Sequence, residues 1–220
     1  MQQLENRIPP TYAWLSHAQK KGLNHGPNIN LFPTRNAGNL GWPASIRHTR
    51  RNARCEIEIT GAIDAGSVST AIRCLLHLQK EDQQLPITLY INSPGGEVQS
   101  GLALYDVMQA VSCPIHTVCL GMAASMAALL FIAGDQREML PHSRVMIHDP
   151  LIGGGIGGSA LSVKARADDL MRIRDITAQV ISQHTGMNLE EVFELTAKDT
   201  YFEAEEAIAN GMADRIITSL

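Results

Sequence analysis

The sequence predicts an α/β fold in which strands and helices alternate along the chain. Two observations carry this prediction. Short apolar runs recur from about residue 55 onward, and most of them are followed by a segment whose apolar side chains return every three or four residues. Glycines lie in the turns that end the first two of these runs. Strands separated by helices in this way favour α/β units with parallel strand pairing.

The first two repeats lie between residues 55 and 111. Residues 55–63 (CEIEITGAI) form a predicted strand that ends in a glycine turn, and residues 86–96 (PITLYINSPGG) form a buried strand that runs into a tight turn. A helix is predicted after each strand from the spacing of its apolar residues. These two apolar stripes comprise Val68, Ala71, Ile72, Leu75 and Leu76, and then Val98, Gly101, Leu102, Tyr105, Met108 and Val111.

The rest of the chain continues the alternation. A third strand is predicted at 114–121 and a helix at 123–134, where the most apolar stretch of the chain lies. This stretch has about 17 residues, fewer than the ~20 that a membrane span needs, so we expect a buried strand and helix and no membrane partner. Two short strands (REML and RVMIH) follow. After them come a glycine-rich segment at 152–159, a long amphipathic helix ending near His184, short helices and a final strand at 213–218.

Residues 1–46 differ from this pattern. They contain RIPP, HGPNINLFP and GNLGWP, which are rich in proline, asparagine and glycine and show no sustained period. This composition predicts an N-terminal arm or propeptide-like segment at 1–46, followed by one compact domain at 47–220.

Charge and cysteine usage exclude several classes of function. The net charge of −4, without any basic run, gives no indication of nucleic-acid binding. The four cysteines form no CxxC motif and are not at metal-ligand spacing with histidine, so we expect buried reduced thiols and no metal site. The N-terminal residues lack the apolar region of a secretory signal, and the predicted location is therefore cytoplasmic.

Ser125 is the first candidate for chemistry. It lies in GMAASMAA, where small neighbours allow close approach of a substrate and where a helix is expected to begin. The free N–H groups at a helix N-terminus stabilise a developing negative charge. The glycines of Ser93-Pro94-Gly95-Gly96 likewise free the backbone for a sharp turn after a buried strand. Taken alone, the Ser125 segment is more typical of a helix packing site, and the Ser93 segment is more typical of an ordinary turn between a strand and a helix.

His148 is the candidate base, because it ends the apolar strand RVMIH. A single histidine at a strand end is more often structural than catalytic. Its neighbour Asp149 points to the opposite face of the strand and cannot easily orient the imidazole. A more distant acid is needed, and Asp199 in AKDTYF is the candidate.

Taken together, these segments resemble the caseinolytic protease (ClpP) family. The successive blocks YINSPGG, GMAASMAALL, LPHSRVMIHDP, HTG and KDTYFEAEEAIANGMAD follow the order of the family's blocks, over roughly residues 55–220. The resemblance implies a serine endopeptidase in which Ser125 is the nucleophile, His148 the general base and Asp199 the group that orients the base. It also implies an oxyanion hole formed by the backbone N–H groups of Gly96 and Met126. A substrate-binding surface formed by Val98, Pro150 and Leu151 is implied as well.

The resemblance implies the assembly as well. Members of this family have a crotonase-like core of repeated ββα units with a protruding helix-strand handle. Seven subunits form a ring, and two rings stack handle to handle into a tetradecamer around a closed chamber. Unfolded polypeptides enter with the help of an AAA+ unfoldase of the ClpX, ClpA or ClpC type. ATP is used by that partner, and the peptidase itself needs no cofactor.

Two features depart from the family pattern. The handle segment contains IGGGIGGSALS and has no acid between Asp149 and Asp168, whereas relatives place an acid there that faces a basic residue beside the triad aspartate. The corresponding basic residue here is Lys198. Residues 1–46 also differ from the short axial loop with which relatives contact the unfoldase.

Three alternatives to an active peptidase remain at this point. One is a weakly active or non-catalytic ClpR-like scaffold subunit of a mixed ring, although such subunits have lost triad residues. Another is a crotonase-fold enzyme acting on acyl-CoA thioesters, which would not use this set of Ser, His and Asp. The third is a binding module, which no sequence feature favours.

Overall fold

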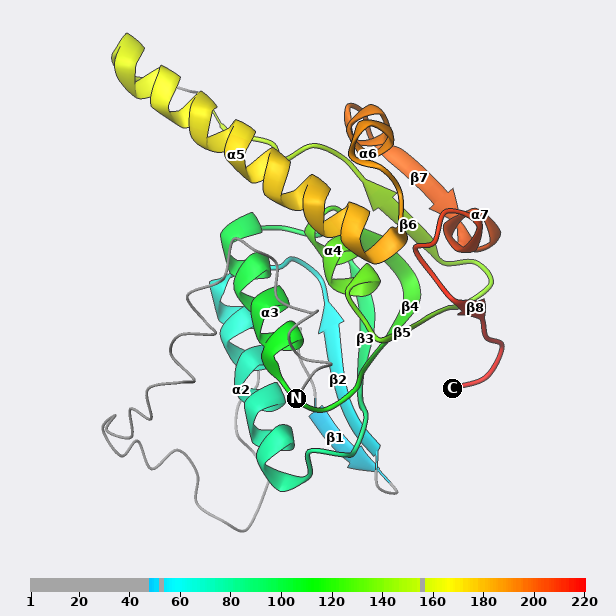
Figure 1. The fold of residues 1–220 in the computed structure, drawn as a ribbon. Coiled ribbons are helices and arrows are strands. Elements are labelled where there is room, and N and C mark those ends of the chain that lie inside the picture. The colour runs from blue at the N-terminus through cyan, green and yellow to red at the C-terminus, as the bar shows by residue number, and fades with distance from the viewer. Residues whose placement is uncertain (1–47, 52–53, 155–156) are drawn as a thin grey trace, which may run out of the picture. The chain divides into compact units, whose positions relative to one another are not determined.

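The computed structural model describes residues 48–51, 54–154 and 157–220. The predicted arm at 1–46 lies outside these described residues. The described part of the chain folds around one eight-stranded sheet flanked by helices, shown in Figure 1. The predicted α/β class is therefore confirmed.

The sheet is mostly parallel. Its main path runs in the order β1-β2-β3-β4-β5-β8, and β1 alone on this path is antiparallel to its neighbour among the described strands. Isoleucine and leucine side chains fill the inner faces of the central strands; Ile57, Leu89 and Ile91 are fully buried. The strands of this path are β1 (His48–Arg51), β2 (Arg54–Thr60), β3 (Ile87–Ser93), β4 (Ile115–Ala124), β5 (Gln136–Met139) and β8 (Arg215–Ile216).

The sheet divides at β4, the longest described strand. The first half of β4, from His116 to Cys119, pairs with β5, whereas residues Met122 to Ala124 pair in parallel with β6 (Arg144–Ile147). Strand β6 pairs in turn with the antiparallel strand β7 (Thr200–Glu203). This division creates a second, smaller set of strands at the carboxyl end of β4.

The helices cover the sheet and extend beyond it. Helices α2 (Ala65–Glu81) and α3 (Val98–Ala110) lie side by side (Figure 1). Helix α4 (Met126–Ile132) is buried at every position, as its Ala- and Leu-rich sequence requires. Helix α5 (Ala160–Thr185) protrudes from the body in Figure 1, and the short helices α6 (Leu189–Thr196) and α7 (Ala204–Ala209) follow it.

Local signals explain where the long helices begin and end. Asp64 caps α2: its carboxylate accepts from the Ser67 N–H, and the Ser67 hydroxyl accepts in return from the Asp64 N–H. Gly186 ends α5 with a left-handed φ of 82°, a conformation that glycine adopts without steric cost.

The structure differs from the sequence prediction in three places. Strand β4 continues to Ala124, so α4 begins only after Ser125 rather than at residue 123. Strands β1 and β7 were not expected, because neither HTRR nor TYFE has a sustained apolar alternation; each is defined by antiparallel pairing with a neighbour. Between 152 and 159 the described residues form no helix or strand, while 155 and 156 lie outside the description.

The cysteines are buried as expected. All four lie in the described part of the chain, where they form no disulfide. Burial raises the pKa of the Cys74 and Cys119 thiols to about 11, which keeps them protonated and poorly nucleophilic at neutral pH.

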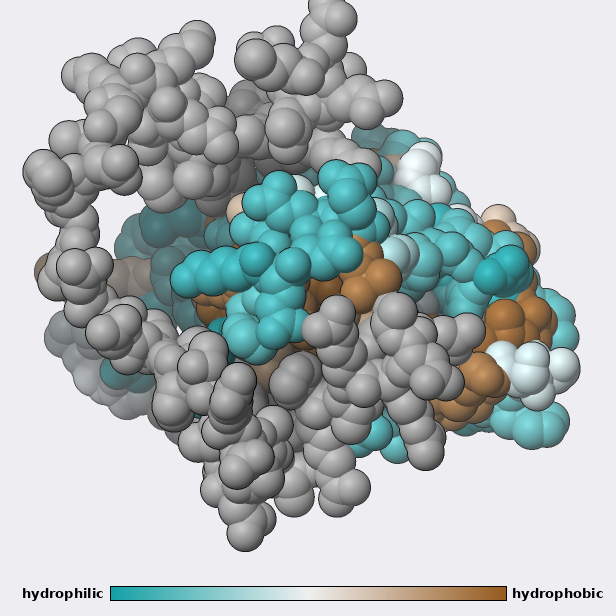
Figure 2. Space-filling view, turned by 90° about the horizontal axis from the view of Figure 1, so that it is seen from below, coloured by the Kyte–Doolittle hydropathy of each residue, from teal (hydrophilic) through white to brown (hydrophobic). Residues whose placement is uncertain are grey.

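Figure 2 shows the molecule from below the view of Figure 1. Where its residues are described, this face is mostly hydrophilic, and hydrophobic residues occur in several separate areas of it. Within the described residues no helix combines the length and the apolar character that crossing a membrane requires.

Candidate active site

The division of the sheet brings the ends of β4 and β6 together. Their parallel register pairs Ala124 with Met146, and Ser125 is the next residue after β4. The Ser125 N–H donates to the Met146 carbonyl at 2.8 Å, which fixes the serine beside the end of β6. His148 follows that strand directly, so two residues 23 positions apart in sequence meet at one edge of the sheet.

Ser125 has an unusual backbone conformation. Its φ of 55° is positive, and among the described residues it is the one residue other than glycine for which this holds. With ψ at −122° it makes a sharp turn between β4 and α4. Such a conformation costs on the order of 1–3 kcal/mol and tends to occur at functional sites. A strained serine on a strand-to-helix turn is also the arrangement that exposes the nucleophile in serine hydrolases of other folds.

The antiparallel pairing of β6 and β7 places an acid opposite His148. The register pairs Ile147 with Thr200, so one further step beyond the strands sets His148 against Asp199. The His148 Nδ1 atom lies 3.1 Å from Asp199 Oδ1, and its Nε2 atom lies 2.8 Å from Ser125 Oγ. The structure thus brings the three residues that the sequence singled out into one hydrogen-bonded chain.

The polarity of this chain suits proton transfer. When Nδ1–H donates to the Asp199 carboxylate, Nε2 is left with its lone pair and accepts from the Ser125 hydroxyl. The His148 side chain is 16% exposed, whereas that of Asp199 is 59% exposed. The carboxylate is therefore held in place by its loop more than by packing around it.

Asp149, the neighbour of His148, faces other partners. Its Oδ1 atom accepts from the Thr196 hydroxyl at 2.6 Å and its Oδ2 atom accepts from Arg174 Nε at 2.7 Å. The Asp149 carboxylate therefore belongs to a separate cluster, and Asp199 is the acid on the imidazole.

The loop containing Gly95 and Gly96 lies against the start of α4. A Cβ atom at position 95 would be 2.6 Å from the Ala124 carbonyl oxygen and 3.0 Å from the Met126 nitrogen, which leaves room for glycine alone. Gly96 forms an isolated bridge with Ile63: the Ile63 N–H donates to Gly95 O, and the Glu97 N–H donates to Ile63 O.

The N–H groups of Gly96 and Met126 are the two predicted oxyanion donors. Among the described residues neither group has a hydrogen-bond acceptor. Met126 is the first residue of α4, where N–H groups lack intrahelical acceptors, so this group can donate to a bound ligand.

Ser93 supports this loop from within the protein. Its side chain is almost fully buried; the hydroxyl donates to the Gly61 carbonyl at 2.6 Å and accepts from the Gly95 N–H at 3.1 Å. The sequence predicted Ser93 only as part of a turn. Its position at the end of a buried strand, just before Pro94 and the two glycines, is the signal that points to this supporting contact.

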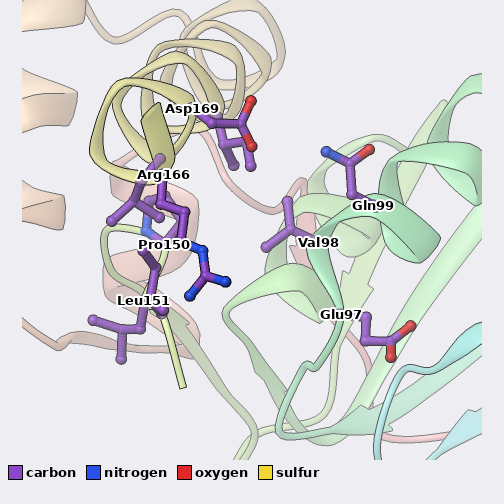
Figure 3. Close-up of a pocket in the computed structure, with 10 residues that line it drawn as sticks. Glu97, Val98, Gln99, Pro150, Leu151, Arg166 and Asp169 are labelled. Atoms are coloured by element: carbon purple, nitrogen blue, oxygen red, sulfur yellow. The ribbon is translucent and has the colours of Figure 1, made fainter. Parts of the chain in front are cut away.

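A groove of about 470 Å³ lies between α3 and α5 (Figure 3). The three residues predicted to bind substrate all line it: Val98 at the start of α3 lies on one side, and Pro150 and Leu151 lie on the other. Ser125, His148 and Asp199 do not line the groove, but His148 is two residues from Pro150. The groove and the hydrogen-bonded chain are therefore formed by different residues, which lie close together in sequence at 148–150.

The contribution of α5 to this groove was not predicted from the sequence. Arg166, Asp169, Leu170 and Ile173 line it. They recur at intervals of three and four residues, which places them on one face of a helix. That spacing is the signal that could have identified them, although nothing in it indicates which element the face contacts.

Comparison with known families agrees with this geometry. The family model described as Clp protease matches residues 47–220, which is most of the chain and contains every residue of the site discussed above. The match confirms the family resemblance, and with it a Clp-type peptidase with the crotonase-like α/β fold. The chain belongs to the Clp protease family.

Proposed function

We propose that this chain is a serine endopeptidase subunit that degrades unfolded polypeptides to short peptides. The observation that carries the proposal is the hydrogen-bonded chain Ser125–His148–Asp199, with 2.8 Å between the hydroxyl and the imidazole. The strained backbone of Ser125 and the two N–H groups beside it add support.

The first half of the proposed reaction forms an acyl-enzyme. Ser125 Oγ attacks the carbonyl carbon of a peptide bond while His148 Nε2 takes the hydroxyl proton. The negative charge on the carbonyl oxygen is stabilised by the N–H groups of Gly96 and Met126, each worth about 3 kcal/mol. The tetrahedral intermediate collapses, the C–N bond breaks, and His148 passes its proton to the leaving amine.

The second half releases the acyl group. Water takes the place of the amine and gives a proton to His148 Nε2 as its oxygen attacks the ester carbon. The second tetrahedral intermediate expels Ser125 Oγ, which recovers its proton from His148. Asp199 holds the imidazole in the Nδ1–H tautomer throughout and stabilises the imidazolium. Protein groups alone carry out these steps, so the proposal includes no metal or cofactor.

The proposed setting is a cytoplasmic ring. Clp proteases generally work as stacked heptamers fed by an AAA+ unfoldase, and we extend this arrangement to the present chain. ATP would be consumed by the unfoldase. An unspecific peptidase is harmless in a cell when its sites face an enclosed chamber, and this requirement supports the ring.

A fluorophosphonate probe tests the catalytic proposal directly. Such probes react rapidly with an activated serine, so the parent chain should be labelled at Ser125 and should cleave short fluorogenic peptides. Ser125→Ala should lose both reactions while keeping the size of the assembly. A parent chain that forms rings but is neither labelled nor active would instead be the ClpR-like scaffold subunit.

A further inference from the structure

Packing around the Asp199 carboxylate is too sparse to hold this group in one position. Its side chain is 59% exposed, yet it must stay within hydrogen-bonding distance of His148 Nδ1. An exposed carboxylate on a loop loses conformational freedom when it is held in one position, and that cost has to be met by fixing the loop itself.

The loop is anchored on both sides of Asp199 to the residues that flank His148. On one side Thr200, the first residue of β7, pairs with Ile147. On the other side Thr196, the last residue of α6, contacts Asp149 twice: its carbonyl accepts from the Asp149 N–H at 2.7 Å, and its hydroxyl donates to Asp149 Oδ1 at 2.6 Å. The two residues beside the base therefore hold both ends of the segment that carries the acid.

Arg174 on α5 completes the second anchor. Its Nε–H donates to Asp149 Oδ2 at 2.7 Å, and its guanidinium group lies 4.1 Å from the centre of the Phe193 ring on α6. The Arg174 and Asp149 side chains are 23% and 30% exposed, and Thr196 is almost fully buried. A partly buried arginine–carboxylate pair supported by an aromatic ring is stronger and more rigid than an exposed ion pair.

We infer that Asp149 and Arg174 are positioning residues of the peptidase: through Thr196 they hold the Asp199 loop against His148. This inference rests on the proposed serine mechanism and adds to it a second acid with a separate task. Asp149 does not touch the imidazole or the reacting atoms. It fixes the distance between the base and the acid that orients it.

Kinetics of three variants test the inference. Asp149→Ala removes both side-chain contacts, and Arg174→Gln removes the charged one while leaving the carboxylate on Thr196. We expect kcat for a fluorogenic peptide to fall about tenfold in each variant, with KM changed less than twofold, because binding in the groove does not depend on the imidazole. Lys164→Gln is the matched control, since Lys164 is an exposed cation on the same helix that pairs with Asp168. It should keep the parent values.

A double-mutant cycle separates positioning of Asp199 from a general structural role. Rates of labelling by a fluorophosphonate probe are compared for Asp149→Ala in the parent and in the Asp199→Asn background. If Asp149 acts through Asp199, its loss should slow labelling about tenfold in the parent and less than twofold in the second background. Equal losses in both backgrounds, or no loss in the parent, would overturn the inference.

A structural measurement keeps the inference testable if the parent chain proves inactive. In a crystal structure of Asp149→Ala, the distance from His148 Nδ1 to Asp199 Oδ1 should exceed hydrogen-bonding range. A distance that stays near 3.1 Å would contradict the inference whatever the activity. If Asp149→Ala does not fold, Arg174→Gln takes its place in both the cycle and the crystal. Absence of labelling in the parent would instead count against the proposed function.

Discussion

The backbone of Gly95 packs directly against Ser125: a Cβ atom at position 95 would lie only 2.8 Å from the Ser125 Cβ atom. Gly95 also has a φ of 90°, in the left-handed region that favours glycine. The predicted nucleophile and the loop that carries a predicted oxyanion donor therefore share one close contact. Any side chain at position 95 would have to push them apart.

Gly95→Ala should consequently impair the reaction much more than the fold. We expect kcat/KM for a short peptide to fall by about 100-fold or more, which is the effect of losing one oxyanion-hole donor in other enzymes. Gly66→Ala is the control, because a Cβ atom there meets Asp64 Oδ1 at an ordinary distance of 3.4 Å. A Gly95→Ala variant with parent activity would show that the loop is not held against the nucleophile.

Asp199→Asn tests the acid of the hydrogen-bonded chain. An amide at this position donates as well as accepts and no longer fixes the Nδ1–H tautomer of His148, so kcat should fall by about 10³- to 10⁴-fold. Glu194→Gln provides the comparison, as it removes an exposed carboxylate from the neighbouring helix α6. Asp149→Asn should cost far less than Asp199→Asn. The opposite ranking of these two variants would show that Asp149 is the orienting acid.

The groove between α3 and α5 should determine binding of the substrate side chain. Val98→Asp would place a charge against Pro150 and Leu151, and a groove that accepts apolar side chains should then lose about 10- to 100-fold in kcat/KM for peptides that carry one. Labelling of Ser125 by a small fluorophosphonate should change less than threefold, since this reagent does not need the groove. Ala103→Asp, on the exposed face of the same helix, is the control. Equal effects of Val98→Asp on peptide cleavage and on labelling would argue against this role.

The histidine at the end of α5 predicts a pH dependence of stability. Burial, followed by the positive charge of Arg137, lowers the pKa of His184, and the imidazole Nε2 lies 3.0 Å from the Tyr105 hydroxyl. The unfolded chain, whose histidine has a pKa near 6.5, then binds more protons than the folded chain. Stability from this site is complete above about pH 6.5 and is lost as the pH falls toward the lowered pKa, by at most ~1.4 kcal/mol per pH unit.

Thermal unfolding of the parent and of His184→Gln between pH 8 and pH 5 measures this effect. The parent should lose stability more steeply on acidification than the variant does. Identical slopes in the two proteins would mean that His184 titrates alike in the folded and unfolded states.

Much of this arrangement follows from sequence, and the exceptions have physical reasons. The strands around Ile57 and Leu89 were predictable because fully buried apolar residues alternate with less buried ones along both, which is the two-residue period of a strand. Ser125, His148 and Asp199 were identified because each lies in a recognisable block. The contact between His148 and Asp199 depends on the register of β6 with β7, and TYFE carries too weak a pattern to predict that register.

Other features lie beyond pattern analysis altogether. The positive φ of Ser125 is imposed by the tertiary structure on both sides of the turn, since serine has no intrinsic preference for it. Arg174 is 25 residues from Asp149, and neither local spacing nor charge order links the two. Long-range polar contacts of this kind depend on how α5 packs against the rest of the protein. The residue pattern of a single sequence does not predict that packing.

The last prediction concerns assembly. Six of the seven residues from 153 to 159 are Gly or Ser, and ordering a glycine costs about 0.5–1 kcal/mol more than ordering an alanine. This segment also offers no acid to pair with Lys198, which is exposed beside Asp199. Exposed ion pairs are individually weak, but several repeated around a ring would bias a weak equilibrium. We therefore expect tetradecamers at high concentration and single heptamers on dilution.

Because Asp199 follows Lys198 directly, specific activity should fall as the rings separate. Mass photometry and peptidase rates over one dilution series would measure both quantities. A Gly157→Asp variant adds an acid to the segment at a position where a Cβ atom would have open space, and it should shift dissociation to lower concentration. A parent tetradecamer that persists at nanomolar subunit concentration with constant specific activity would contradict this account of the handle, and an active monomer would contradict the ring itself.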